Sequence, residues 1–431
     1  MRFKNGCWSC YYTQLDMSEA KIMTAEETPP REAVKFTAEE RSVVGVLAGI
    51  YTTRMLGFFL LLPVLSLYVS QLPGSSPRMV GVAMGTYALV QAMLQIPFGR
   101  WSDRYGRKPM IAIGLGLFLL GSVVGALTTT LTGIIIARAI QGSGAMSAAV
   151  TALLADYTRD VVRTRAMAFI GISIGASFVV SLIAAPSLDA VIGVSGIFWV
   201  MAALATAGLL LLQMGIPAHV GRDEQKRSTT SLWRVMLLPQ LRGYFVGVFA
   251  LHFILSNTFL SVPQILVHVL KIPKQHHWQV YLGVFLVSLL GTYAFIRKVE
   301  RSQSPQWIIV SAIMLATAAQ ASMALWNGWL WPLLGIFSAF FAAFNFLESS
   351  LPTGLSRAAP LSDRGAALGV FATLQSLATF AGALLGGQVA ARFGYGNVFW
   401  LSAGMGTLWL GVAAFYRPNT EVSTDPVTDN D

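Results

Sequence analysis

The sequence predicts an all-α membrane protein in which twelve transmembrane helices form two pseudo-symmetric six-helix bundles. Three observations support this prediction: the scarcity of charge, the recurrence of long apolar runs, and similar local features in the two halves. Of 431 residues, 55% are apolar and 12% are charged, whereas a soluble domain carries about 25% charged residues. So little charge cannot cover the surface of a soluble protein of this length.

The apolar runs are long enough to cross a bilayer, for which about 20 residues are needed. They lie near 44–69, 78–98, 109–128, 131–153, 166–190 and 195–216, and then near 241–268, 277–296, 305–326, 329–353, 366–388 and 395–416. These runs divide the chain into five predicted segments. They are a cytoplasmic N-terminal tail (1–43), an N-terminal bundle (44–216), a cytoplasmic linker (217–240), a C-terminal bundle (241–416) and a cytoplasmic tail (417–431).

The distribution of lysine and arginine predicts the orientation of the chain. The predicted loops after even-numbered helices contain sixteen of these residues, and the loops after odd-numbered helices contain four. Basic residues accumulate in cytoplasmic loops, so we expect a multi-pass protein of the cell inner (plasma) membrane with both termini in the cytoplasm. The same rule accounts for the net charge of +10, and we infer no nucleic-acid partner.

The two predicted bundles share local features at nearly constant spacing. The paired positions are Pro63 and Pro263, Pro109 and Pro305, and Arg165 and Arg364. They indicate a duplicated six-helix unit with the same orientation in both halves, although chance similarity between apolar helices is the alternative. Parallel repeats of this kind place a substrate site between the halves, near the middle of the membrane.

The strongest local signal is the loop between the second and third predicted helices, Gly99-Arg-Trp-Ser-Asp-Arg-Tyr-Gly-Arg-Lys108. Glycine allows a tight turn, and an aspartate among basic residues can cap a helix or pair with arginine. The loop resembles the signature loop of the major facilitator superfamily, except that Trp101 stands where the family usually has a smaller aliphatic residue. The matched positions are Gly99, Asp103, Arg104, Gly106, Arg107 and Lys108. The alternative interpretation is an ordinary basic cytoplasmic loop.

A second match lies in the fourth predicted helix, where Arg138-Ala-Ile-Gln141-Gly142 resembles the arginine motif of the same family. Asp156 resembles the acidic partner of the signature loop. The resemblance implies that Asp103, Arg107 and Asp156 form a cytoplasmic latch, which holds the halves together when the site faces outward and opens otherwise. The alternative is that these charges only mark the topology.

Two further resemblances concern the branch of the family. The fifth predicted helix matches the antiporter motif in part, because Ala185 stands before Pro186 where the antiporters have glycine. The segments 54–63 and 344–352 resemble the YajR-type branch of drug-efflux-like proton antiporters. This resemblance implies proton antiport, and the incomplete motif weakens that implication.

Polar groups inside predicted spans are functional candidates, because they are costly in a bilayer. Arg54 lies about 15 Å into the first helix at 1.5 Å per residue, and His252 lies at a similar depth in the seventh. Glu348 is the acidic residue placed well inside a predicted span. The candidates for proton coupling or for the substrate cavity are Arg54, Arg138, Gln141, His252, Asn257, Asn345 and Glu348, with Gln91, Gln95 and Gln375 as further polar lining.

Each of the three principal candidates also has an alternative interpretation. Glu348 could be the buried partner of an arginine, and His252 could make a hydrogen bond between helices. Arg54 could instead bind a substrate anion or a carboxylate.

These features imply a secondary active transporter that works by alternating access and exports small organic compounds in exchange for protons. An uptake symporter or a facilitator of the same fold is the alternative, and a membrane sensor or a membrane-embedded enzyme is a distant one. We expect no enzyme activity and no cofactor, since Cys7 and Cys10 alone would leave a zinc ion short of sulfur ligands. We expect a monomer whose partners are a small-molecule substrate, protons and the lipid bilayer. The apolar lining favours uncharged or weakly cationic substrates.

Overall fold

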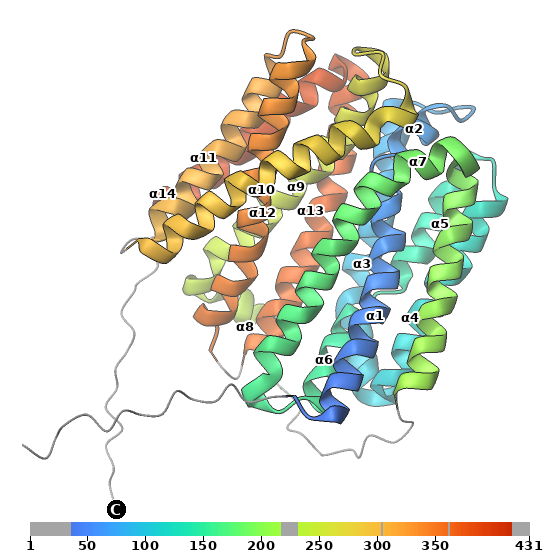
Figure 1. The fold of residues 1–431 in the computed structure, drawn as a ribbon, viewed down its shortest axis with the longest axis vertical. Helices are drawn as coiled ribbons and strands as arrows, with labels where there is room; N and C mark the ends of the chain where they lie inside the picture. Colours follow the sequence, from blue (N-terminus) through green and yellow to red (C-terminus); the bar gives the residue numbers. More distant parts are fainter. Residues whose placement is uncertain (1–35, 217–231, 303–304, 361–362, 416–431) are drawn as a thin grey trace, which may run out of the picture.

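The structure is a computed structural model that describes residues 36–216, 232–302, 305–360 and 363–415. Within these residues, every regular element is a helix. The two helical halves lie side by side, with the N-terminal half on the right of Figure 1 and the C-terminal half on the left. Cys7, Cys10, most of the predicted N-terminal tail and the predicted C-terminal tail lie outside the described residues.

The N-terminal half contains α1 to α7. Their bounds are α1 (Ala38–Leu60), α2 (Leu65–Ser70), α3 (Pro77–Tyr105), α4 (Arg107–Leu127), α5 (Leu131–Ser143), α6 (Ser147–Tyr157) and α7 (Asp160–Gly215). The segments α1 and α2 form one span that is interrupted at Pro63, because proline removes a backbone donor and crowds the preceding turn. Likewise, α5 and α6 form one span that is interrupted at Gly144.

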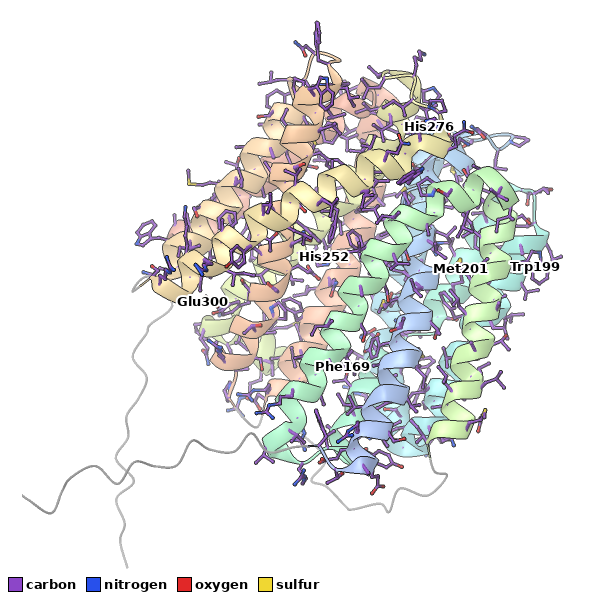
Figure 2. All side chains as sticks on the ribbon, in the orientation of Figure 1. Phe169, Trp199, Met201, His252, His276 and Glu300 are labelled. Carbon is purple, nitrogen blue, oxygen red and sulfur yellow. The ribbon has the colours of Figure 1, made fainter. Side chains whose placement is uncertain are left out.

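The long helix α7 comprises two membrane spans. Gly193 has a φ of 66°, which glycine adopts at little cost, and the chain reverses direction there (Figure 1). On the returning arm, Trp199 is 48% exposed at the outer edge of the molecule, whereas Met201 is fully buried (Figure 2). The described residues contain eleven helical segments that are long and apolar enough to cross a membrane. Since α7 supplies two spans, the predicted fold of twelve transmembrane helices is confirmed.

The C-terminal half repeats this plan. Its elements are α8 (Leu232–Leu237), α9 (Pro239–His268), η1 (Lys274–His276), α10 (His277–Arg301), α11 (Pro305–Ala324), α12 (Leu330–Ala358), α13 (Arg364–Phe393), η2 (Tyr395–Asn397) and α14 (Val398–Phe415). Both halves begin earlier than the apolar runs indicate. The helix α1 starts inside the segment assigned to the tail, and α8 and the start of α9 lie inside the segment assigned to the linker. The first turn of α1 is polar and is capped by Thr37, so hydropathy alone does not detect it.

The halves contact each other at the end of the molecule opposite the Gly99–Lys108 loop. There α3 packs on α13, α2 packs on α9, and α7 packs on α10, which is the upper end in Figure 1. The backbones of α3 and α13 approach closely, because a Cβ on Gly81 would overlap the carbonyl oxygen of Ala383. These contacts close one end of the space between the halves.

Candidate substrate cavity and its polar walls

A cavity of about 3920 Å³ lies between the two halves. Its walls come from helices of both halves, from Arg54 and His252 at depth to the Gly99–Lys108 loop at one end of the molecule. His252 lies near mid-height of the molecule (Figure 2). The fold therefore joins the signature loop and several of the predicted intramembrane residues, including Arg54, Arg138, His252 and Glu348, in one continuous space.

Arg54 in α1 is 1% exposed and lines the cavity. Its Nη2 donates a hydrogen bond to the Tyr87 hydroxyl at 3.0 Å, and its Nη1 donates to Ser147 Oγ at 3.4 Å. Its Nε has no hydrogen-bond partner in the described structure. A fully buried guanidinium is thus held by two neutral hydroxyl groups.

Arg138 in α5 contacts the ring of the same tyrosine, Tyr87. The side chain is 3% exposed, and its guanidinium carbon lies 4.5 Å from the centroid of the Tyr87 ring. Its Nη1 donates to Gln141 Oε1 at 2.9 Å, and Gln141 Nε2 donates to Ser122 Oγ at 2.9 Å. Gln141 is fully buried and does not line the cavity, so its place is behind Arg138, whose orientation it fixes.

The opposite wall carries a carboxyl–imidazole pair. Glu348 Oε2 in α12 lies 3.5 Å from His252 Nε2 in α9, and Gln375 Nε2 in α13 lies 2.7 Å from the same ring nitrogen. The other ring nitrogen, Nδ1, lies 3.1 Å from the carbonyl oxygen of Val248. His252 is 6% exposed, while 42% of the Glu348 side chain is exposed to the cavity.

Phenylalanines from both halves also line the cavity. They are Phe58, Phe59, Phe178, Phe259 and Phe344, with Phe285 and Phe371 beyond them. Phe178 in α7 packs edge-on against Phe59 and Phe259, with ring centroids 5.2 Å and 6.2 Å apart. This aromatic surface spans both halves and is suited to flat, apolar molecules.

Two asparagines that we predicted to line the cavity occupy different environments. Asn345 lines the cavity, and its Nδ2 lies 3.4 Å from Ser288 Oγ. Asn257 is fully buried away from the cavity, and its side-chain oxygen lies where a Cβ on Gly386 would stand. The prediction for Asn257 is therefore wrong. On α9, His252, Ser256 and Phe259 form the face that lines the cavity, and position 257 is turned about 100° away from that of Ser256.

The signature loop is organised around Arg107. Its guanidinium forms ion pairs with Asp103, at 3.3 Å, and with Asp156 at the end of α6. Gly106 has a φ of 100°, a conformation that explains the glycine at this turn, and Lys108 Nζ donates to the carbonyl oxygen of Ile216 at 2.5 Å. Asp103, Arg107 and Asp156 are thus brought together, and the contacts of the cluster lie inside the N-terminal half.

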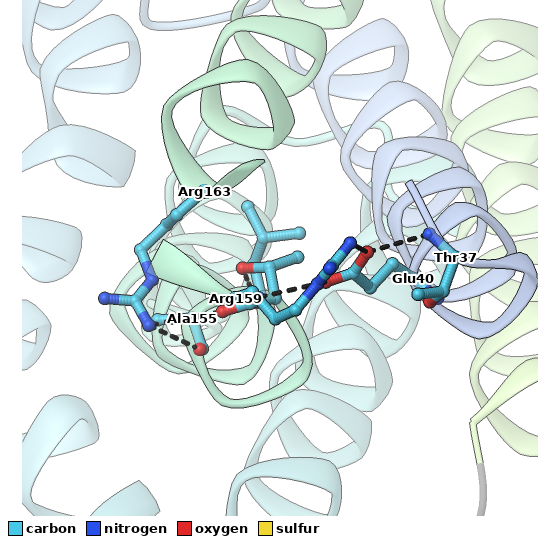
Figure 3. A network of polar contacts seen from close by, with 7 residues as sticks. Thr37, Glu40, Ala155, Arg159 and Arg163 are labelled. Atoms are coloured by element: carbon cyan, nitrogen blue, oxygen red, sulfur yellow. Dashed lines mark hydrogen bonds and ion pairs between the residues drawn. The ribbon is translucent and has the colours of Figure 1, made fainter. Parts of the chain in front are cut away.

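A polar network that we did not predict joins α1 to the connection between α6 and α7 (Figure 3). Thr37 and Glu40 form a capping box at the start of α1. Glu40 also accepts three hydrogen bonds from Arg159, from the backbone nitrogen at 3.1 Å, from Nε at 2.8 Å and from Nη2 at 2.9 Å. The Thr-x-x-Glu pattern was visible in the sequence, but the contact with Arg159 depends on the tertiary fold.

Comparison with known proteins agrees with this architecture. Residues 47–360 match the model of the Major Facilitator Superfamily. The chain is 38% identical over 395 residues to the inner membrane transport protein YajR of Escherichia coli, which covers 90% of this chain and 86% of that protein. It is 25% identical to multidrug resistance protein 2 of Bacillus subtilis, over 81% of this chain and 89% of that protein.

Among solved structures, a bacterial homologue of the human lysosomal transporter Spinster, in an inward-facing and occupied conformation, superposes with a TM-score of 0.70. The match covers 88% of this chain and 96% of that chain at 13% identity, and it supports the fold. The family model and the YajR relative go further, since each spans most of the membrane region. The chain is a transporter of the major facilitator superfamily.

Proposed function

We propose that the protein is a proton-coupled exporter of small organic compounds that works by alternating access in the cell inner membrane. The observation that carries this proposal is the cavity between the halves, which combines an aromatic surface with the His252–Glu348 pair. Similarity to an inner membrane transport protein and to a multidrug resistance protein supports the location and the substrate type. The monomer is the working unit, since both walls of the cavity come from one chain.

The halves near 44–216 and 241–416 act as two bodies that rock about the cavity. Basic loops favour the cytoplasm, which assigns the Gly99–Lys108 end of the cavity and both chain termini to the cytoplasmic side. The described conformation is then open inward, with the outer end closed by α3 and α13. The Asp103–Arg107–Asp156 cluster acts as a gate that contacts the C-terminal half when the inner end closes.

The proton site is the His252–Glu348 pair. A carbonyl oxygen accepts hydrogen bonds only, so His252 Nδ1 donates to Val248. The other ring nitrogen, Nε2, then has two alternative hydrogen-bond partners. In a neutral ring it accepts from Gln375, whereas in a charged ring it donates to Glu348. A proton taken up or released here changes the hydrogen bonds between α9, α12 and α13 and thereby favours one conformation of the C-terminal half.

Everted membrane vesicles test this proposal. The cargo is the compound that most strongly stabilises the purified protein in a thermal screen of anionic, neutral and cationic aromatic molecules. We expect an imposed gradient, acidic inside, to drive its accumulation, and we expect Glu348→Gln to reduce accumulation to the level without a gradient. The control is Glu300→Gln, which removes a carboxylate at the end of α10 outside the cavity. Equal accumulation without a gradient would refute proton coupling, and unchanged transport by Glu348→Gln would remove that residue from the mechanism.

The second candidate function is uptake by symport or by facilitated diffusion. One observation favours it, because fully buried Ala185 replaces the glycine of the antiporter motif before Pro186. The same vesicles separate the two directions. A symporter preloaded with the compound would lose it down an acid-inside gradient, whereas the exporter would retain it and accumulate more.

A further inference from the structure

We propose that the cargo is an amphipathic organic anion whose acidic group binds to Arg54 and Arg138 on the N-terminal wall of the cavity. This inference rests on the proposed function, because it names the substrate class of that same cavity. It replaces our expectation of uncharged or weakly cationic substrates, which assumed that the cavity holds little charge.

The first argument is the missing counter-charge. Arg54 and Arg138 are each at least 97% buried, and their contacts are to hydroxyl groups, an amide and aromatic rings. Among the residues that the structure describes, no carboxylate forms an ion pair with either one. Burial of a charge without an opposite charge is costly, so an anion that reaches these groups gains more than it would at the surface.

The second argument is the geometry around Tyr87. Its hydroxyl accepts a hydrogen bond from Arg54, and its ring lies against the guanidinium of Arg138. One tyrosine therefore contacts both cations, Arg54 through its hydroxyl and Arg138 through its ring. The Nε of each arginine has no hydrogen-bond partner in the described structure, and guanidinium groups match the planar oxygen pairs of carboxylates and the oxygens of sulfonates and phosphates.

The third argument is the division of the cavity between charge and apolar surface. The carboxylate of Glu348 faces His252 on the opposite wall, so the acidic group of the C-terminal half already has a partner. Aromatic side chains, including Phe58 next to Arg138 at 5.8 Å, cover the surface nearby. A molecule with an acidic group and an aromatic body satisfies both surfaces.

The charge of the whole cavity lining also favours an anionic ligand. Nine arginine or lysine side chains and three carboxylates line it from the deep arginines to the mouth. A cleft lined mainly by one sign of charge concentrates ligands of the other sign. The basic mouth follows from the topology rule for cytoplasmic loops, so the specific part of the proposal depends on the two deep arginines.

The test uses the full-length protein in lipid nanodiscs and three matched probes: 1-naphthoate, naphthalene-1-sulfonate and the cation 1-naphthylmethylammonium. Isothermal titration is expected to detect binding of at least one anion and weaker binding of the cation. Arg54→Gln and Arg138→Gln should each weaken anion binding about tenfold or more, because each removes a charge-assisted contact. The control Arg297→Gln removes an arginine that lies over Tyr293 outside the cavity, and it should bind like the wild type.

The outcomes separate this inference from the proposed function. Equal or tighter binding of the cation, no binding of either anion, or unchanged anion binding in both arginine variants would overturn the anion proposal and leave proton-coupled transport standing. Anion binding without gradient-driven accumulation would overturn the transport mechanism and leave the anion site standing. If a glutamine variant fails to fold, Arg138→Lys and Tyr87→Phe replace it. Both should weaken anion binding, and wild-type affinity in both would overturn the proposal.

Discussion

At one end of the molecule, α3 and α13 of opposite halves approach so closely that Gly81 has no room for a side chain beside Ala383. At the other end, the ion pairs of Arg107 and of Glu40 join elements of the N-terminal half alone. The closed end is therefore held by backbone packing between the halves, whereas the open end is held by charge within one half. In the proposed rocking motion, the small residues at the closed end let the halves approach closely, and the ion pairs at the open end stiffen the half that moves as a unit.

Side-chain hydrogen bonds also link the halves at the closed end. Gln264 Nε2 donates to the carbonyl oxygen of Ser66 at 2.9 Å, and Lys274 Nζ donates to Gln71 Oε1 at 3.4 Å. The first is a neutral hydrogen bond with a net strength of about 1 kcal/mol, and the second is a long contact exposed to solvent. In the part of the chain that the structure describes, no ion pair joins the halves, so the interface can separate and reform without breaking one, as the proposed alternating access requires.

The largest effect is expected from Gly81→Leu, which disrupts the packing between the halves at the closed end. The new side chain forces α3 away from α13, and overpacking costs about 1–3 kcal/mol. A shift of this size changes the ratio of the two conformations about 5- to 150-fold. Labelling of Thr151→Cys in the cavity by a membrane-impermeant maleimide, with Cys7 and Cys10 replaced by serine, should fall in everted vesicles and rise in right-side-out vesicles.

The control for this change is Gly116→Leu in α4, where nothing lies within 4 Å of an added Cβ. It places the same bulky residue in the same half and should leave the labelling of Thr151→Cys unchanged. Equal labelling of the Gly81 and Gly116 variants from both sides would contradict the view that glycine packing between α3 and α13 holds this end closed.

The fold was more predictable than the site, for a physical reason. Membrane spans depend on the summed hydropathy of about 20 residues, so small errors cancel, and the signature loop is a continuous motif. Arg54 and Arg138 were candidates because charge in a span is rare. Their link through Tyr87 was not predictable, because it joins α1, α3 and α5 by packing. Asn257 was assigned wrongly because the cavity-facing side of α9 was unknown before the helix was placed among its neighbours.

A smaller effect is expected from Arg107→Gln, which removes the ion pairs of Arg107 at the open end. Arg107 faces both Asp103 and Asp156, so its loss leaves two neighbouring carboxylates without their shared cation. The groups are partly exposed, and the expected cost lies between that of surface and buried pairs, at about 1–3 kcal/mol. The melting temperature of the purified protein should fall, and Arg107→Lys should recover part of it.

The comparison with the second half provides the control. Arg297 lies in the last turns of α10, and its guanidinium lies 5.4 Å from the Tyr293 ring centroid. Arg297→Gln should lower the melting temperature less than Arg107→Gln does. An equal decrease would mean that the charge cluster of the N-terminal half contributes no more to stability than an exposed arginine.

The smallest effect is expected from the loss of a helix cap. One threonine cap lies at each end of the molecule, so the two ends can be compared by the same substitution. Thr37 caps α1 at the open end, where its hydroxyl accepts from the backbone nitrogen of Glu40 at 3.1 Å. Thr130 caps α5 at the opposite end by accepting from Gly133 at 3.1 Å.

Replacement of a threonine cap by alanine costs about 1 kcal/mol. Each substitution removes one capping hydroxyl, and the backbone nitrogen of residue 37 still donates to the Glu40 carboxylate in Thr37→Ala. Fraying of the first turn of α1, however, also displaces Glu40, whose side chain accepts from Arg159. We therefore expect Thr37→Ala to lower the melting temperature more than Thr130→Ala does. Because Glu40 joins α1 to the start of α7, the reverse order would mean that this network does not stiffen the N-terminal half.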